Sequence, residues 1–212
     1  MSALILVDLQ NDFMPGGALA VKDGLDILPA VNKLLEVPFD VIVATKDWHP
    51  ADHGSFAETH RRKVGDVIDL EGIPQILWPV HCVQETNGAE FCSGWDHSKV
   101  EEVFHKGIER NVDSYSTFFD NGNRRSTGLA DYLRDRGVKR VFLAGLVTEY
   151  CVKYSVLDAI RLGFETFVIP EGCRGVNLHP LDAKTALEEM KKMGAHLASL
   201  QDVEKKVRGG GI

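Results

Sequence analysis

The sequence lacks any apolar run that approaches the roughly 20 consecutive residues of a membrane-spanning helix. Positive charge is also in short supply, with 24 lysines and arginines against 31 aspartates and glutamates and a net charge of -7. These two shortages argue against a membrane and against nucleic acid as the main partner. The sequence shows no internal repeat, low-complexity block or interdomain linker. We therefore expect residues 1–212 to form a single domain with a full hydrophobic core.

Cysteine is scarce and scattered. The four cysteines are Cys82, Cys92, Cys151 and Cys173, with no CxxC pair among them and no N-terminal leader of charged and then apolar residues. This pattern predicts free thiols in a reducing compartment, and hence a cytoplasmic protein. The short basic end, KKVRGGGI, is expected to be a frayed tail.

What the sequence does contain is an alternation of short apolar runs and helical patterns. The apolar runs predict mostly fully buried strands at Ala3–Leu9, Phe39–Thr45, a run ending at Lys106, Arg140–Leu146, Glu165–Pro170 and Ala195–Leu200. Helical patterns lie between most of them, at Ile27–Leu35, Gly128–Arg136, Val152–Leu162 and Leu181–Met193. This rhythm predicts a three-layer α/β/α fold around a mostly parallel, open sheet of about six strands.

One region breaks the rhythm. The segment 50–98, which follows the second predicted strand, is rich in His, Gly, Pro and Trp and has little periodicity. In a compact α/β domain it is too long for an idle connection, so we interpret it as a functional excursion. In an open parallel sheet ligands bind outside the carboxyl ends of the strands. The polar residues that end the apolar runs are therefore the candidate site residues.

Cys151 is the candidate nucleophile among them. The spacing of the apolar residues that follow it places Cys151 in the first turn of a helix, with Thr148 as the predicted N-cap. The positive end of the helix dipole stabilises a thiolate there, and free backbone amides can receive an oxyanion. The alternative is a buried structural thiol, which suits Cys82, Cys92 and Cys173 better.

Asp8 and Lys106 each end a predicted strand. A partly buried Asp8 beside a thiol can act as a general base whose pKa is raised by desolvation, although a turn residue that binds nearby amides is equally compatible with its position. Lys106 stands just before Gly107, and between Asp8 and Cys151 it would hold both in their charged forms. A solvated lysine is the simpler alternative.

Asp47 and His49 form a D-x-H pair in the stretch KDWHPADHGSF. In extended chain they project to the same side and offer one oxygen and one nitrogen to a metal ion. The candidates for a third ligand are His53, His60 and His81, and hydrogen-bonding loop histidines are the alternative. A local cluster with His53 would close on an ion with little loop entropy.

Seven stretches together resemble a known family. In order along the chain they are DLQNDF (8–13), GGALAV (16–21), DWHPADHGSF (47–56), WPVHCV (78–83), HKG (105–107), DSYSTFFD (113–120) and GLVTEYCV (145–152). In this order and spacing the chain, from about Ala3 to Asp202, resembles the nicotinamidases, also called pyrazinamidases, of the isochorismatase-like cysteine hydrolases. Glu149 departs from the pattern, because the family commonly has Asp at this position, and we expect tuning rather than loss of function.

The resemblance implies a set of roles. It implies a catalytic triad of Asp8, Lys106 and Cys151, and an oxyanion hole from the amides of Val147 and Cys151, with a cis peptide between Leu146 and Val147. It also implies one divalent metal ion, zinc before iron or manganese, held by Asp47, His49 and His81, with His53 as an additional or outer ligand. Phe13, Leu19, Val21, Trp78 and Tyr115 are the residues we place around the substrate ring, with core packing as the alternative for the aromatic ones.

The implied reaction is hydrolysis of nicotinamide to nicotinic acid and ammonia, with pyrazinamide as a second implied substrate. The implied partner is this small molecule, and a homo-oligomer is left open. Three alternatives differ in class: a metal-dependent hydrolase in which Cys151 is incidental, a metal-independent hydrolase of another small amide or of isochorismate, and a silent binding module. They differ in whether turnover survives loss of Cys151 or chelation of the metal.

Overall fold

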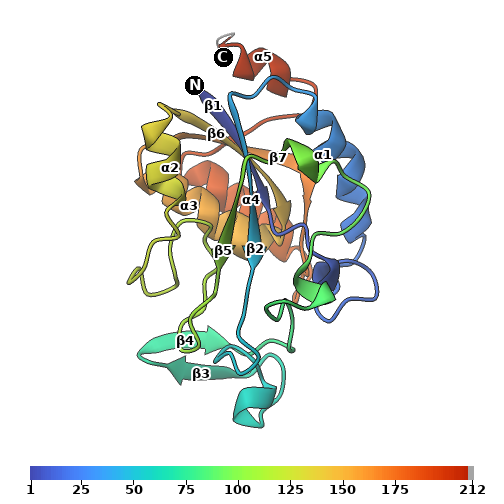
Figure 1. Ribbon diagram of the computed structural model, residues 1–212, viewed down its shortest axis with the longest axis vertical. Helices are drawn as coiled ribbons and strands as arrows, with labels where there is room; N and C mark the ends of the chain where they lie inside the picture. The colour runs from blue at the N-terminus through green and yellow to red at the C-terminus, as the bar shows by residue number, and fades with distance from the viewer. Residues whose placement is uncertain (210–212) are drawn as a thin grey trace.

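A six-stranded parallel sheet forms the centre of the molecule in the computed structural model, which describes residues 1–209 (Figure 1). Its strands are β1 (Ser2–Val7), β2 (Val41–Asp47), β5 (Glu102–Lys106), β6 (Arg140–Leu146), β7 (Glu165–Arg174) and β8 (His196–Leu197). Their order across the sheet is β5-β2-β1-β6-β7-β8, and each neighbouring pair is parallel. The predicted α/β fold with about six strands is confirmed.

β1 shows why a continuous apolar run becomes a central strand. All six of its residues are buried, because β2 and β6 pair with its two edges and helices cover both of its faces. Leu4 and Leu6 point into one core cluster, and Ala3, Ile5 and Val7 point into the other. A strand buried on both faces has no need of polar residues, which is the pattern typical of parallel sheets.

Helices form the two outer layers. The first face is covered by α1 (Leu28–Leu35) and by α5 (Val203–Val207), and the second by α2 (Leu129–Asp135), α3 (Lys153–Arg161) and α4 (Asp182–Lys192). Figure 1 shows α1 on the opposite side of the strands from α2 and α3. No helix within residues 1–209 is both long and apolar enough to cross a membrane.

The expectation of a frayed basic tail is wrong for its first part. Lys205 and Lys206 lie in α5, and Val203 and Val207 anchor this helix in the first core cluster. Two buried valines one helical turn apart give a five-residue helix the apolar contact that holds it on the sheet. The last residues of the predicted tail, 210–212, lie outside the described part of the chain.

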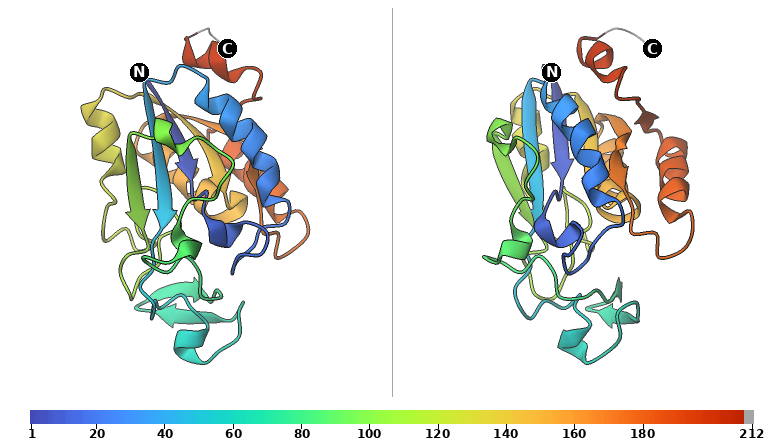
Figure 2. Two further views of the ribbon diagram at one scale, coloured as in Figure 1. Left: turned by 45° about the vertical axis from the view of Figure 1, so that its right-hand side comes forward. Right: turned by 90° about the vertical axis from the view of Figure 1, so that its right-hand side faces the viewer.

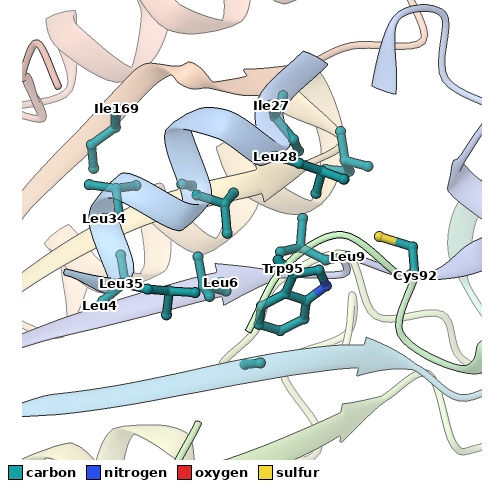
Figure 3. Close-up of a cluster of buried hydrophobic side chains, with 14 of the residues drawn as sticks. Leu4, Leu6, Leu9, Ile27, Leu28, Leu34, Leu35, Cys92, Trp95 and Ile169 are labelled. Carbon is teal, nitrogen blue, oxygen red and sulfur yellow. The ribbon is translucent and has the colours of Figure 1, made fainter. Parts of the chain in front are cut away.

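Leu34 lies at the contact between α1 and the sheet. Its side chain is fully buried and lies beside Ile169 of β7 in Figure 3. Leu34→Ala should lower the free energy of unfolding by about 2–5 kcal/mol, because it removes a buried side chain and leaves a cavity. Urea unfolding measures the change. Lys33→Ala, at an exposed position of the same helix, should change stability by less than about 0.5 kcal/mol, and equal losses would contradict the packing argument.

The strand order reverses beside β1, and this sets the position of the site. The chain moves from β1 to β2 and β5 on one side, then returns to β6 on the other side. Such a reversal opens a crevice at the carboxyl ends of the two strands that diverge. Gly145 allows β6 to pass β1 closely here, because it has φ +136 and a Cβ atom would lie 2.1 Å from the Val7 carbonyl oxygen.

The excursion after β2 contains a small antiparallel hairpin that was not predicted. β3 (Val67–Leu70) pairs with β4 (Ile73–Ile76) through the two-residue turn Glu71-Gly72. Both views in Figure 2 show this hairpin beyond one end of the large sheet, with α5 at the other end. The arrowheads of β2 and β5 point towards it in Figure 1, so the hairpin lies at the carboxyl end of the sheet.

Candidate active site

Four strands deliver the central polar side chains to one place. Asp8 follows β1, Asp47 ends β2, Lys106 ends β5, and Cys151 lies in the turn after β6. Asp47 and Lys106 are direct register partners across the β2–β5 pair. Because parallel strands end at the same edge of the sheet, residues up to 143 positions apart become neighbours, and the structure brings together all four of these predicted residues.

The Lys106 ammonium lies at the centre of this group. Its Nζ is 2.9 Å from Asp8 Oδ2, forms a second ion pair with Asp47, and donates to the Ser114 carbonyl at 3.0 Å and to Cys151 Sγ at 3.3 Å. Burial lowers the pKa of Lys106, but Asp47 and Asp8 outweigh burial and raise this pKa well above its usual value. The lysine is therefore charged, and its position between Asp8, Asp47 and Cys151 leaves no room for a cation there.

The two carboxylates differ in their tendency to take a proton. Burial raises the pKa of Asp8 to about 6, against the opposing effect of Lys106, and the Thr45 hydroxyl donates to Asp8 Oδ1 at 2.6 Å. Burial acts the same way on Asp47, but Lys106 and His49 outweigh it and hold the pKa of Asp47 below its usual range. Two neighbouring carboxylates whose pKa values are pushed apart divide the tasks, so Asp8 is suited to proton transfer and Asp47 stays ionised.

Cys151 was expected to be a thiolate in the resting protein, and the structure differs from this expectation. Cys151 lies in a π-helical turn, Thr148–Val152, that runs into α3, and the N-cap of this turn is Val147 rather than the predicted Thr148. Burial raises the pKa of the Cys151 thiol well above its usual value, although Lys106 acts in the opposite direction. The thiol is neutral at rest, and its proton has a nearby acceptor, because a carboxylate oxygen of Asp8 and Sγ lie within 4.8 Å. The predicted cis peptide between Leu146 and Val147 is present.

The side chains of Asp47, His49 and His81 lie close together in a second group beside Lys106. The Nε2 atoms of both histidines lie 3.8 Å from Asp47 Oδ2. The ring Nδ1–H of His49 donates to the Gly107 carbonyl at 2.9 Å, and that of His81 donates to the Pro79 carbonyl at 2.8 Å. A carbonyl can only accept, so each Nδ1 carries a hydrogen, and in the neutral ring Nε2 keeps a lone pair that can bind a cation.

This donor set fits a divalent cation. Metal-binding histidines usually donate their other ring N–H to a carbonyl or carboxylate, as both do here. Burial and the neighbouring His49 lower the pKa of His81 to about 4, which keeps its imidazole neutral. Burial acts to lower the pKa of His49, but the Asp47 carboxylate outweighs burial and raises this pKa. The region between Asp47 and His49 therefore favours positive charge.

His53 and His60 lie differently. The ring of His53 stacks on that of His49 with centroids 4.3 Å apart. Its Nδ1 lies 2.7 Å from the Ser55 hydroxyl and its Nε2 lies 3.3 Å from the Val112 carbonyl. His60 Nε2–H donates to the Gly54 carbonyl at 2.8 Å. His53 is not in the group formed by Asp47, His49 and His81, but with His49 and Asp113 it forms a second set of side chains that could hold an ion.

A largely apolar cavity opens on both groups. Asp47, His81 and Cys151 are on its wall, together with Phe13, Leu19, Trp78, Asp113, Tyr115, Val147, Tyr150 and Val176. Four of the predicted ring-pocket residues line it, and Val21 does not: it is buried in the first core cluster, where its backbone N–H bonds the Phe13 carbonyl. Val21 was predicted to line the pocket because it belongs to the GGALAV stretch. The chain turns at Leu19, so the Val21 side chain points into the core and not into the cavity.

Sequence reasoning missed other wall residues. Tyr150 packs edge-on against Trp78, with centroids 5.0 Å apart, and its position next to Cys151 was a usable signal. Trp78 Nε1–H donates to the Tyr115 hydroxyl at 3.1 Å, and Gln75 of β4 donates to the same hydroxyl at 3.2 Å. Asp113 accepts from Gln75 at 2.9 Å. The hairpin therefore holds the aromatic wall in place through one buried glutamine.

Comparisons with known proteins identify the family of this chain. The isochorismatase domain family matches residues 2–202. A nicotinamidase of Escherichia coli (strain K12) is 47% identical over 205 residues, which cover 95% of this chain and 96% of that protein. A solved nicotinamidase/pyrazinamidase of Acinetobacter baumannii superposes with a TM-score of 0.91 at 38% identity, over 95% of this chain and 97% of the other.

A second solved structure bears on the metal. The pyrazinamidase of Pyrococcus horikoshii, solved in complex with zinc, is 40% identical with a TM-score of 0.76, over 93% of this chain and 98% of the other. Together with the donor set of Asp47, His49 and His81, this similarity supports a divalent metal site. The chain belongs to the isochorismatase family, and within it to the nicotinamidase and pyrazinamidase group that its motifs predicted.

Proposed function

We propose that this protein is a nicotinamidase, a cysteine amidohydrolase that converts nicotinamide to nicotinic acid and ammonia and also accepts pyrazinamide. The observation that carries the proposal is the convergence of a thiol, a proton-accepting carboxylate and a buried ammonium on a cavity with aromatic walls. The names of the related proteins point to the same reaction. The product would enter pyridine nucleotide salvage, and the free thiols fit the reducing cytoplasm.

We assign the acylation steps to Asp8 and Cys151. Asp8 takes the proton of the Cys151 thiol, and the sulfur adds to the carboxamide carbon. The amides of Val147 and Cys151, both on the cavity wall, receive the oxyanion. Asp8 then gives its proton to the amide nitrogen, the C–N bond breaks, and ammonia leaves a thioester on Cys151. Lys106 stabilises the anionic forms of both partners from its central position.

The second half of the reaction uses the same residues. Asp8, ionised again, takes a proton from a water molecule that adds to the thioester carbonyl. The C–S bond breaks, nicotinic acid forms, and Asp8 returns the proton to the Cys151 sulfur. One water is consumed and one ammonia released in each cycle. The Asp8 carboxyl group, with a pKa of about 6, can accept a proton in one step and donate it in the next.

Asp47, His49 and His81 would hold one divalent ion, which we propose is zinc because two imidazoles and a carboxylate suit it; iron and manganese tolerate the same donors. When bound, the ion supplies Lewis acidity that attracts the ring nitrogen of the substrate. Phe13, Trp78 and Tyr115 flank the ring. His53, in contact with His49, is assigned a supporting role at this site.

We further propose that the chain works as one domain. β1, near the start of the chain, and α5, near the end of the described residues, share the first core cluster. Both core clusters include residues of β1 and β6, the two strands that border the crevice.

The direct test is release of ammonia from nicotinamide by the purified, metal-loaded protein. We expect ammonia and nicotinic acid in equal amounts, with turnover lost in Cys151→Ala and after chelation. Turnover that survives Cys151→Ala but not chelation would instead identify a metal-dependent hydrolase. Turnover that survives chelation would identify a metal-independent amidase, and no ammonia from the wild-type protein would leave a binding module.

Alkylation should distinguish Cys151 from the other thiols. Iodoacetamide is itself a small carboxamide, so it should enter the cavity and react first with Cys151, whose proton Asp8 can take. Burial raises the pKa of Cys92 to about 11 and that of Cys173 to about 12, and neither lines the cavity. Peptide mass mapping should show labelling of Cys151 in step with loss of activity, and nicotinic acid should slow both. Faster labelling of Cys92 with activity retained would contradict the assignment.

A further inference from the structure

Glu149 is a buried carboxylate that the proposed reaction does not use. It lies two residues before Cys151 in the same π-helical turn, with 9% of its surface exposed. Its Oε1 accepts the backbone N–H of Asn177 at 2.6 Å. Because β7 ends at Arg174, this bond ties the turn that carries the nucleophile to the loop that follows the neighbouring strand.

The loop has space for this carboxylate only because residue 175 is glycine. A Cβ atom at Gly175 would lie 2.4 Å from Glu149 Oε2 and 2.6 Å from Ala183 Cβ. Oε2 has no hydrogen-bond partner within residues 1–209, so it contributes shape rather than a second bond. The long side chain therefore fills the space beside Gly175 and reaches one residue past Val176 to Asn177.

Asn177 presents its N–H to Glu149 from a fixed conformation. Its φ is +50, a left-handed value that asparagine tolerates better than most residues. Its side-chain Oδ1 accepts the Ala183 N–H of α4 at 3.0 Å, and its Nδ2 donates to the Gly175 carbonyl at 3.3 Å. The segment 175–177 is thus held at one end by α4 and on its inner side by Glu149.

Val176, between these two anchored residues, is a wall of the substrate cavity. It lines that cavity together with Cys151 and Tyr150, and it also lines a second cavity behind it, bordered by Thr148, Cys173 and Arg174. Val176 therefore borders both spaces. A small displacement of the segment 175–177 would enlarge the substrate cavity towards the second one without moving Cys151.

We propose that Glu149 is a specificity-determining positioning residue, which holds Val176 in place through Asn177 and so limits the ring substituents that the cavity accepts. The inference rests on the proposed nicotinamidase activity. It assigns Glu149 no contact with the substrate and no proton transfer. An aspartate at this position is one methylene shorter and would not reach Asn177 from the same backbone, which makes Glu149→Asp the informative change.

The test compares nicotinamide with 5-methylnicotinamide in wild type, Glu149→Asp and Glu149→Gln. In Glu149→Asp the ratio of kcat/KM for the methylated substrate to that for nicotinamide should rise about tenfold, the effect of one methyl group in an apolar pocket. The change for nicotinamide should fall mainly on KM, with kcat within about threefold of wild type. Glu149→Gln keeps the length and an acceptor oxygen for Asn177, so it should retain the wild-type ratio.

Two further variants complete the design. Val176→Ala should raise the same ratio directly, and Glu149→Asp combined with Val176→Ala should add little to either single change, because both act through one wall. Glu188→Asp, an exposed glutamate of α4, is the matched control and should leave the ratio unchanged. If Glu149→Asp does not fold, a wild-type ratio in Val176→Ala still overturns the proposal.

The outcomes separate this inference from the proposed function. No ammonia from nicotinamide in the wild-type protein would reject the nicotinamidase activity itself. A wild-type protein that is active, with an unchanged ratio in a folded Glu149→Asp variant, would reject only the role of Glu149. Equal losses of kcat for both substrates in Glu149→Asp would also reject it, because they would place Glu149 in support of the nucleophile and not of Val176.

Discussion

Asp8→Asn should lower kcat for nicotinamide by about 10²- to 10⁴-fold, because the amide keeps the shape of the side chain but cannot take the Cys151 proton. Asparagine can also keep the bond to Thr45 and tolerates the left-handed backbone at this position, where φ is +51. Steady-state ammonia release measures the effect. The loss should appear in kcat and kcat/KM alike, as expected for an interaction that matters only in the transition state.

The same substitution should leave Tm unchanged or raise it slightly at neutral pH. Burial raises the pKa of Asp8 to about 6, above that of the unfolded chain, so above pH 6 its ionised form makes folding less favourable and a neutral side chain removes that cost. Lys106 retains Asp47 as its partner. Asp23→Asn is the matched control, since Asp23 is an exposed aspartate with φ +57. Turnover near the wild-type rate in Asp8→Asn would make Asp8 a turn residue.

The centre of the sheet could be predicted because its strands are buried on both faces. β1 and β6 are apolar apart from their first residues, Ser2 and Arg140, and Asp8 could be selected because it directly follows such a run. Asp47 and Lys106 were selected in the same way at the ends of β2 and β5, although β5 is only partly buried. β7 was predicted to end at Pro170 but continues to Arg174. A register shift opposite Leu143 and Gly145 accommodates the proline, which has no N–H to donate.

The hairpin and part of the pocket could not be predicted in this way. β3 and β4 have four residues each and are only partly buried, so they carry no clear alternation. Their turn has positive φ at Glu71 and Gly72, and glutamate is not among the residues that signal such a turn. Val176 lies in an irregular loop, and only the fold places it against Cys151. Contacts between distant loops depend on the arrangement of the strands rather than on any local pattern.

His81→Ala should remove the metal, whereas His53→Ala should retain it. In the structure His81 Nε2 lies 3.8 Å from Asp47 Oδ2, and its Nδ1–H is held by the Pro79 carbonyl, so the substitution deletes one of three converging donors. The two ring nitrogens of His53 face Ser55 and Val112 instead. Loss of its contact with His49 should weaken metal affinity by about 10- to 100-fold at most, as for other residues that support a ligand.

Metal content per protein chain, measured by mass spectrometry on variants loaded with zinc and then desalted, decides between the two histidines. We expect less than a tenth of the wild-type content in His81→Ala and most of it in His53→Ala.

Calorimetry should show that nicotinamide binding weakens together with metal content in His81→Ala, because His81 lines the same cavity as Trp78 and Cys151. His60→Ala, a partly buried histidine bonded to the Gly54 carbonyl, should retain full metal as the matched control. Full metal in His81→Ala with an empty site in His53→Ala would reverse the assignment, and would mean that the ion lies between His49, His53 and Asp113.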